Sequence, residues 1–481
     1  MIANTYGTTD DYSGMPTVVN GLAPDDLEKL KELYKVWRDK LIRNDIKLKY
    51  YNGKNVLKDL GISIPPQLTN VNTTIGWAAK AVDKLAIHSQ FDGFVSKDGD
   101  IEELEEILHE NNFKELYRQL VTSELIHSCA FLTVSKGDIG EPDVLISGYG
   151  ADNAAAVWNA RHKRIDYGLT ITATDKNSDD AIKSPIDMNL YTDNHVVRIY
   201  RVKNSWQAEY YPHGLGRPLM EPLVYSPSLN KPFGKSKISR AVMSITDSAV
   251  RTALRTEVSA EFFTTPQKYL LGADEEAFKD TSKWQAYIGT IFAVTKDEDG
   301  DIPQFGQLSQ MSMQPHIDYM RSLASQFAGE TNIPVNELGI IHDNPSSADA
   351  IKAAKEALVM DAESLNANNG YHLATIGKMC LALSRGVSLD AIEERVTSNF
   401  RNPERLSTAS TSDAILKQVQ AFPWLANTRV ALEELGYSEE KIIRLMSEKR
   451  RAEAKYKVNN IFAKEKVNEE ENDTDKSTET V

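Results

Sequence analysis

The sequence predicts an α+β protein in which an N-terminal sheet domain is followed by long helices. Between residues 144 and 225, short apolar runs alternate with polar residues and are separated by Asp, Asn, Gly and Pro, which is typical of antiparallel sheet. From 236 to 263 there is no Gly or Pro, and apolar residues recur every three or four positions, as in a helix. A chain of 481 residues is also long enough for several hydrophobic cores.

The N-terminal half is expected to form one α+β domain over 25–235, preceded by a flexible arm over 1–24. A helix begins after Pro24, because acidic residues follow in its first turn, where the helix dipole favours anions. Its apolar residues lie on one face. Further helices are predicted over 71–87 and 113–127, and the last of them leads into a strand at 129–135.

The centre of the chain has the order helix, short insert, helix. The first helix spans 236–265, the insert 266–314 and the second helix 315–333. Both helices carry an apolar stripe: Ile238, Val242, Ile245, Ala249, Val250, Leu254, Val258 and Phe262 on the first, and Ile317, Met320, Ala324 and Phe327 on the second. The stripes either contact copies of the chain in neighbouring subunits or form a helical hairpin buried in a monomer. The pattern alone does not choose between these alternatives.

A loop at 334–347 precedes a long helix predicted over 348–386. Ser346 and Asp349 fit the start of a capping box, so the helix should begin near Ser347. A cluster of Asn and Gly residues at 366–370 predicts a kink. Segments 388–396, 411–421, 428–435 and 438–459 predict a helical domain over 387–460, and the acidic tail 461–481 is expected to be disordered.

Composition excludes several classes of function. Asp and Glu outnumber Lys and Arg by 69 to 55, the opposite of a protein that grips nucleic acid through phosphates, and acidity is compatible with letting DNA pass. Cys129 and Cys380 match no metal-ligand spacing, so we expect two reduced core thiols and neither metal nor cofactor. No apolar run is long enough for a membrane span, and the N-terminus has no features of a secretory signal.

Catalytic motifs are incomplete. Gly234-Lys235-Ser236 matches the end of a phosphate-binding loop, but position 229, where the motif requires Gly, is Leu. Nothing near His342-Asp343 completes an acid–base pair or a metal site. We therefore predict that the protein is not an enzyme and has no catalytic residues. A nucleotide-dependent enzyme that uses the Gly234-Lys235-Ser236 stretch stays an alternative.

Three segments carry a resemblance to a known family. They are FFTTPQKYLLGADEEAF, WQAYIGTIFAVTKDEDGDIPQFGQ and NIPVNELGIIHDNPSSADAIKAAKEALV, and the match depends on their order and spacing. The chain resembles the portal proteins (head-to-tail connectors) of tailed bacteriophages, especially the siphophage type. The resemblance implies a portal-type fold whose parts are a wing (25–235), stem helices (236–265 and 315–333), a clip (266–314), a tunnel loop (334–347), a long kinked helix (348–386) and a crown (387–460).

The resemblance also implies a function. Portal proteins form rings, dodecameric in the virion, at one capsid vertex, and conduct double-stranded DNA during packaging and ejection. The implied partners are copies of the chain, DNA, the terminase large subunit, a head–tail adaptor, and the major capsid and scaffolding proteins, but no membrane. The implied location is the virion, with assembly in the host cytoplasm. A phage assembly protein without a channel is another alternative.

The implied site residues fall into three groups. The tunnel loop would present Ile340, Ile341, His342, Asp343 and Asn344 to DNA. In the stem, Arg251 and Arg255 would form basic rings, or would make ion pairs between subunits with Asp247 or Glu257. In the clip, the candidates for contact with terminase or adaptor are Lys268, Tyr269, Trp284 and Tyr287.

Overall fold

The computed structural model describes eleven segments of the chain, which fall into two compact units. The described residues are 14–54, 73–96, 101–175, 184–203, 205–263, 268–271, 304–307, 312–339, 348–404, 408–437 and 441–456. Unit 1 is Met1–Pro403 and unit 2 is Glu404–Val481. Both helices and sheets are extensive, so the protein belongs to the mixed α/β class.

The largest sheet of unit 1 has six strands in the order β1-β9-β8-β7-β6-β5. All neighbouring strands are antiparallel except β1, which pairs parallel with β9. This agrees with the alternating pattern of the sequence. The strands are β1 (Val19–Asn20), β5 (Ala154–Asn159), β6 (Arg164–Thr174), β7 (Pro185–Tyr191), β8 (His195–Val202) and β9 (Ser205–Pro212).

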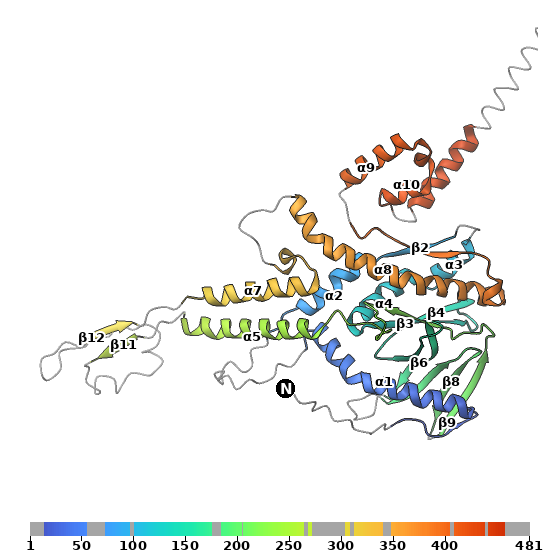
Figure 1. Ribbon diagram of the computed structural model, residues 1–481, viewed down its shortest axis with the longest axis horizontal. Coiled ribbons are helices and arrows are strands. Elements are labelled where there is room, and N and C mark those ends of the chain that lie inside the picture. Colours follow the sequence, from blue (N-terminus) through green and yellow to red (C-terminus); the bar gives the residue numbers. More distant parts are fainter. Residues whose placement is uncertain are drawn as a thin grey trace, which may run out of the picture. The chain divides into compact units, whose positions relative to one another are not determined.

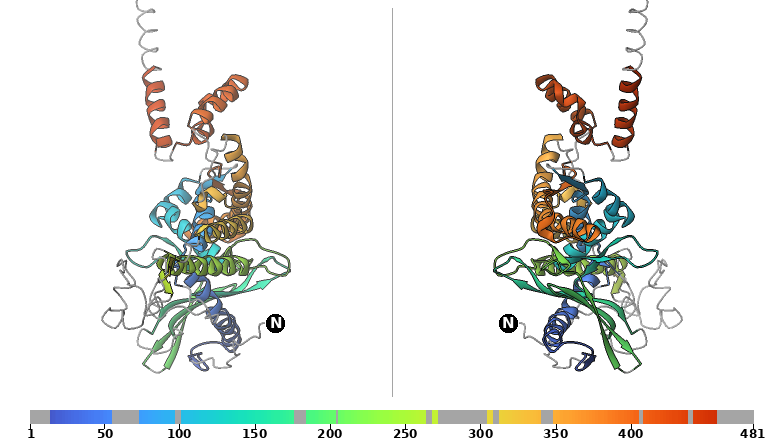
Figure 2. Two further views of the ribbon diagram at one scale, coloured as in Figure 1. Left: turned by 90° about the vertical axis from the view of Figure 1, so that its left-hand side faces the viewer. Right: turned by 90° about the vertical axis from the view of Figure 1, so that its right-hand side faces the viewer.

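Helix α1 (Pro24–Tyr51) packs against this sheet (Figures 1 and 2). Its buried face includes Leu30, Tyr34 and Trp37, which form a separate hydrophobic core with apolar residues of the sheet. The indole nitrogen of Trp37 donates a 2.8 Å hydrogen bond to the backbone oxygen of Asp152, so the polar edge of this buried ring is also satisfied. The core of α1 and the sheet is thus closed within the chain.

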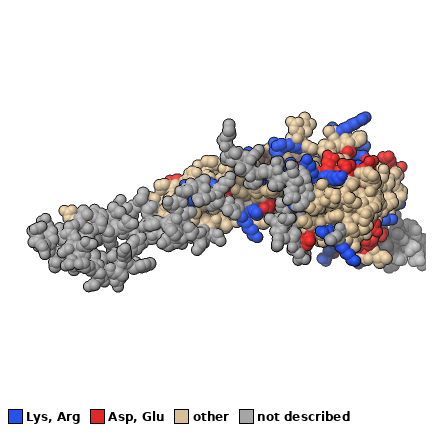
Figure 3. All heavy atoms as spheres, turned by 90° about the horizontal axis from the view of Figure 1, so that it is seen from below, with Lys and Arg blue, Asp and Glu red and all other residues tan. Residues whose placement is uncertain are grey.

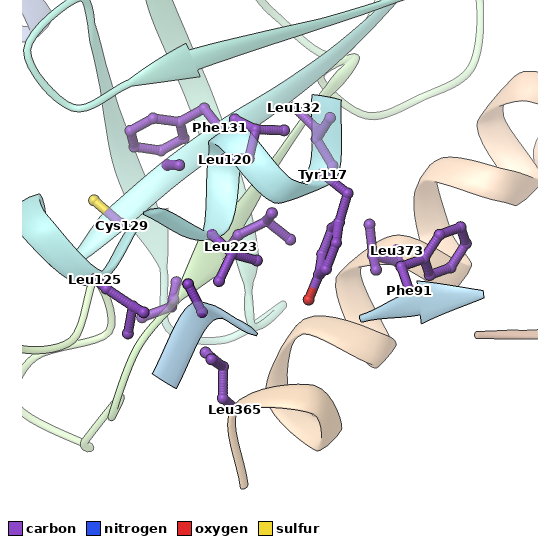
Figure 4. Close-up of a cluster of buried hydrophobic side chains, with 14 of the residues drawn as sticks. Phe91, Tyr117, Leu120, Leu125, Cys129, Phe131, Leu132, Leu223, Leu365 and Leu373 are labelled. Carbon is purple, nitrogen blue, oxygen red and sulfur yellow. The ribbon is translucent and has the colours of Figure 1, made fainter. Parts of the chain in front are cut away.

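A three-stranded antiparallel sheet in the order β10-β3-β4 forms the centre of the second core of unit 1. Helices from distant parts of the chain cover it. Figure 4 shows Tyr117 and Leu120 close to Phe131 and Leu132, with Leu365 and Leu373 approaching from a later helix. The elements are α2 (Trp77–His88), α3 (Glu102–Glu110), α4 (Phe113–His127), β3 (Cys129–Lys136), β4 (Val144–Gly150), β10 (Met220–Val224) and α8 (Ala348–Arg385).

The long helices of the centre begin at defined residues. Helix α5 spans Arg240–Phe263, so the prediction that it starts at residue 236 was wrong by four residues. Ser239 caps the helix instead, because its hydroxyl accepts a 3.1 Å hydrogen bond from the backbone NH of Val242. A two-stranded ribbon follows, and then further helices. The elements are β11 (Lys268–Leu271), β12 (Gln304–Gln307), α7 (Gln314–Thr331) and the 3-10 turn η3 (Val335–Leu338).

Helix α8 runs through Asn366–Gly370 as a single helix of 38 residues, and Figure 1 shows that its axis bends. The segment after it differs from the prediction. Residues 388–396 were expected to be helical, but they contain only the 3-10 turn η4 (Leu389–Ala391) and lead into strand β13 (Val396–Phe400). Strand β13 pairs antiparallel with β2 (Phe91–Ser96), so a tertiary partner far away in sequence decides its conformation.

Unit 2 contains the remaining helices. They are α9 (Thr408–Ala421), the 3-10 turn η5 (Pro423–Asn427), α10 (Arg429–Glu434) and a helix over 441–456. The three helices agree with those predicted from the sequence. Ile415, Ala431 and Ile442 are buried, and each comes from a different helix.

Candidate functional site

Helices α5 and α7 form an antiparallel pair that extends from the sheets of unit 1 toward β11 and β12 (Figure 1). Hydrogen bonds connect both ends of the pair. At one end the hydroxyl of Ser239 donates to Glu330 over 3.0 Å, and at the other the hydroxyl of Ser259 lies 3.2 Å from Nε2 of His316. The register of the two helices is therefore fixed along their length.

The apolar stripes of this pair are covered at one end and uncovered at the other. On α7, Phe327 and Ala324 are fully buried, Met320 is half-buried, and Ile317 is 44% exposed. On α5, Val242 and Ala249 are buried near the sheets, whereas Leu254 and Val258 further along the helix are only half-buried. A single copy of the chain thus leaves the stripes incompletely covered near β11 and β12.

The two arginines predicted on this pair lie on α5, and the structure brings neither within 4 Å of a carboxylate among the described residues. Arg255 is exposed. Arg251 is half-buried, and its Nε atom is buried without a hydrogen-bond partner. The hydroxyl of Tyr50 donates to the carboxylate of Asp247 and lies 2.9 Å from both of its oxygens, and the predicted ion pair of Asp247 between subunits stays a prediction. A buried guanidinium nitrogen is costly without an acceptor, so Arg251 has unused capacity for one.

The remaining predicted site residues are only partly described. Lys268 and Tyr269 lie on β11, where they pair with Gln307 and Gly306 of β12. Trp284 and Tyr287 lie outside the described residues. The same holds for Ile340, Ile341, His342, Asp343 and Asn344, so the predictions for the tunnel loop stay predictions.

The described N-terminal part of this loop, residues 334–339, is held by lysines from two helices. Glu337 of η3 accepts a 2.6 Å hydrogen bond from Lys84, and its other carboxylate oxygen lies 4.0 Å from Lys355 of α8. Lys80 donates to the backbone oxygen of Glu337 over 2.7 Å. The hydrogen bond from Lys84 is the main reason that the pKa of Glu337 lies below its usual range. The N-terminal base of the predicted loop is therefore fixed to α2 and α8.

Sequence reasoning missed a cluster of buried hydrogen bonds, here called the buried polar joint, that connects α8 to α4, β10 and neighbouring residues of unit 1. Asn369 of α8 is fully buried, donates a 2.8 Å hydrogen bond to Glu124 of α4 and accepts one from the backbone NH of Val224. Burial raises the pKa of Glu124 from 4.5 to about 8, and the hydrogen bond from Asn369 partly opposes this. The second carboxyl oxygen of Glu124 has no partner. The carboxyl is therefore largely protonated at neutral pH.

Two further contacts belong to the same joint. Asp361 of α8 accepts hydrogen bonds from Lys237 over 2.5 Å and from the hydroxyl of Tyr225 over 3.1 Å. Asn366 accepts a 2.6 Å hydrogen bond from Ser89, which also contacts the buried hydroxyl of Tyr117. The polar residues that predicted a kink thus serve as buried attachment points. Their spacing along one helical face was the available signal.

The Gly234-Lys235-Ser236 stretch is occupied by internal contacts. The backbone NH of Gly234 donates to Lys231, and that of Lys235 donates to Tyr225. The hydroxyl of Ser236 donates to the backbone oxygen of Ile126 over 2.5 Å. A phosphate-binding loop requires free amides that point at the phosphate, so these contacts speak against the nucleotide-binding alternative.

The described residues contain no group of three or more His, Cys, Asp or Glu side chains arranged for a metal ion. Nor is any helix in the described ranges both long and apolar enough to cross a membrane. On the face drawn in Figure 3, basic and acidic side chains of unit 1 lie close together. The described residues visible on this face therefore form no continuous basic surface.

In comparisons of sequence, a family model and two curated relatives all point to the same family. Residues 30–455 match the family model described as "Phage portal protein, SPP1 Gp6-like". The curated "Portal protein" of Mycobacterium phage D29 is 27% identical over 404 residues, and that of Mycobacterium phage L5 is 26% identical over the same length. Each alignment covers 81% of this chain and 81% of the relative.

Similarity to solved structures is weaker. A chain from the virion of the native gene transfer agent particle matches with a TM-score of 0.41 and 13% identity, covering 72% of this chain and 85% of that chain. A chain from the neck of the same native particle, computed with C12 symmetry, matches with a TM-score of 0.42 and 12% identity, covering 75% of this chain and 91% of that chain.

Proposed function

This chain belongs to the phage portal protein family, and we propose that its copies assemble into a ring that conducts double-stranded DNA. The ring is dodecameric and lies at one vertex of the capsid in the virion. DNA passes through it during packaging and ejection. The ring hydrolyses nothing itself, because the terminase large subunit docks on it and supplies the work before head–tail adaptors replace the terminase.

The parts of the portal fold are assigned as follows. Residues 25–235 form the wing, which contacts the major capsid and scaffolding proteins, and α5 with α7 form the stem. Residues 266–314 form the clip, which contacts terminase and then the adaptor. Residues 334–347 form the tunnel loop, 348–386 the helix that leads to the crown, and 387–460 the crown. Assembly takes place in the host cytoplasm.

The observation that carries this proposal is the gradient of burial along α5 and α7. Ile317 and Leu254 belong to stripes that the chain covers completely only near the sheets. Copies of the same hairpin placed side by side around an axis would cover the remaining apolar surface, and each would use the same two helix faces. A closed ring is the arrangement in which no copy is left with an uncovered face.

The charge of Arg251 supports the same arrangement. Its buried Nε atom lacks an acceptor within one copy, and Glu257 on the same helix is exposed. An acceptor from a neighbouring subunit would satisfy the guanidinium group. The net charge of −14 suits a conduit for DNA, since strong binding of phosphates along the whole channel would oppose movement, whereas a local basic segment would not.

Electron microscopy of the purified full-length protein tests the proposal. We expect end-on views of annuli whose central pore admits a DNA duplex. The mass of the assembled species, measured by light scattering, gives the number of copies. A monodisperse single-copy particle at all protein and salt concentrations, without annuli, would contradict the proposal. ATP turnover that is lost in Lys235→Ala would instead support the enzymatic alternative.

A further inference from the structure

The helix over 441–456 in unit 2 is basic, although the chain as a whole is acidic. It contains six Lys or Arg residues and two Glu residues, whereas the chain has a net charge of −14. Five of its cations are exposed. Four of these share one face of the helix, Lys441, Arg444, Arg451 and Lys455, whereas Arg450 lies on the opposite face. We call these four residues the basic stripe.

The helical period places the basic stripe on one face. Its members follow one another at intervals of three, seven and four residues, which correspond to nearly whole turns. At a rise of 1.5 Å per residue, the stripe is about 21 Å long. Ile442 is buried, and Lys449 donates a 3.0 Å hydrogen bond to Asn427 of η5. Both lie on the opposite side of the helix, so the basic stripe faces away from the rest of unit 2.

The cations of the stripe are largely unpaired within the described chain. Arg444 contacts Glu448 at 3.3 Å, one turn away on the same exposed face. Lys441 lies 4.2 Å from the centre of the Tyr437 ring. Among the described residues, no carboxylate lies within 4 Å of Lys441, Arg451 or Lys455. An exposed row of cations in an acidic protein creates a local positive potential that attracts polyanions.

We propose that the basic stripe binds the phosphate backbone of double-stranded DNA, an inference that rests on the proposed function. Duplex DNA carries one negative charge per about 1.7 Å of its axis, so a row of cations about 21 Å long can contact several phosphates. Arginine and lysine side chains contact phosphates without reading the base sequence. Binding is therefore independent of sequence and strongly dependent on salt.

An acidic protein segment is the other polyanion that the stripe could bind. Stable protein interfaces contain a buried apolar centre surrounded by polar residues. No large apolar residue lies within the stripe itself, whose line along the helix also holds Glu448. The exposed Ile443 lies at one edge, about 80–120° round the helix from Arg444, Arg451 and Lys455, and the exposed Tyr456 lies at the other edge. Because the basic stripe has charged residues and no apolar centre, the phosphate backbone of DNA is a better partner for it than an acidic protein segment.

Fluorescence anisotropy with a labelled 30-base-pair duplex tests this inference on the full-length protein. The variant K441Q/R444Q/R451Q/K455Q removes the stripe with residues that favour helix. The control K35Q/K40Q/R43Q/K49Q removes the same number of charges from exposed positions on α1. At about 50 mM salt, we expect the stripe variant to bind at least about tenfold more weakly than the control. The salt slope should fall by about 0.9 for each cation that contacts phosphate.

Additional measurements distinguish failure of the DNA-binding inference from failure of the proposed function. Circular dichroism and electron microscopy show whether both variants keep their helices and their annuli, and K441R/K455R should bind DNA like the unchanged protein. If annuli form but both quadruple variants bind DNA equally, the inference is wrong and the proposed function stands. Absence of annuli from the unchanged protein would refute the proposed function itself. Stripe-dependent binding of a glutamate-rich peptide, with unchanged binding of the duplex, would assign the stripe to an acidic protein instead.

Discussion

The α1 sheet region and the α5–α7 hairpin differ in how their apolar faces are covered. In the former, α1 covers strands β5–β8, and Leu30, Tyr34 and Leu190 are completely buried within one chain. In the latter, burial falls from Phe327 at 0% exposed to Ile317 at 44% exposed along one helical face. Both regions contain regular amphipathic elements. The difference is that the first supplies its own partner surface and the second lacks one near β11 and β12, where the proposed ring would place other subunits.

Replacing Trp37 should show how much the core between α1 and the sheet contributes to the free energy of unfolding of one chain. Trp37→Ala removes a side chain that is 2% exposed, together with its hydrogen bond to Asp152, and leaves a cavity between α1 and the sheet. We expect a loss of about 3–5 kcal/mol in the free energy of unfolding, measured by urea denaturation. Trp206 in the same region is only half-buried, so Trp206→Ala serves as a control and should cost less. Equal losses from both variants would contradict a core closed by α1.

The joint beneath α8 should respond to pH. The pKa of Glu124 is raised from 4.5 to about 8 by burial, so the folded state holds this proton more tightly than the unfolded state. Its contribution to stability is fully present below pH 4.5 and is lost as pH rises from there to about 8. We therefore expect the free energy of unfolding to fall by several kcal/mol over this interval because of Glu124 alone.

Glu124→Gln isolates that contribution. Glutamine cannot ionise, and its amide oxygen can still accept the hydrogen bond from Asn369. The variant should be less sensitive to pH than the unchanged protein between about pH 5 and 8, and more stable than it at pH 8, as measured by urea denaturation at a series of pH values. The same dependence in both proteins would show that Glu124 is not protonated in the folded state.

The two regions also differ in how far the sequence could predict them. Helix α4 was predicted with its exact bounds, because local periodicity and its flanking residues determine it. Helices α5 and α7 were predicted, and Val242, Ala249, Ala324 and Phe327 of their apolar stripes are buried, whereas the sequence left open what covers the rest. Strand β13 was missed because its conformation depends on pairing with β2, about 300 residues earlier.

The buried polar joint was beyond prediction for a related reason. Asn366 and Asn369 weaken an isolated helix, so local reasoning predicted a kink. Their actual partners, Ser89 and Glu124, come from elements more than 240 residues earlier in the chain. Side chains that satisfy one another across such distances leave only helical spacing as a local signal. The predicted loop residues Ile340–Asn344 and the residues Trp284 and Tyr287 lie outside the described chain, so their roles stay predictions.

Ile317→Asp should have the smallest effect on the stability of one chain. It is also the most direct test of whether the α5–α7 hairpin, unlike the α1 sheet region, is covered by other subunits. Ile317→Asp places a charge at the uncovered end of the α7 stripe, where the side chain is 44% exposed. Because the substitution is near the surface, the free energy of unfolding of a single chain should change by no more than about 0.5 kcal/mol. Association should nevertheless weaken by about tenfold or more per contact, since burying an isoleucine contributes about 1.5–3 kcal/mol and an unpaired charge opposes burial.

Gln326→Asp provides the matched control, because it introduces the same charge at an exposed position of the same helix, outside the stripe. Light scattering and electron microscopy of the three proteins at equal concentrations should show annuli for the unchanged protein and for Gln326→Asp, and smaller species for Ile317→Asp. If Ile317→Asp assembles normally while Gln326→Asp does not, the contact between subunits uses the other face of α7. The gradient of burial would then reflect only the distance from the sheets, and the stripe would have no role in assembly.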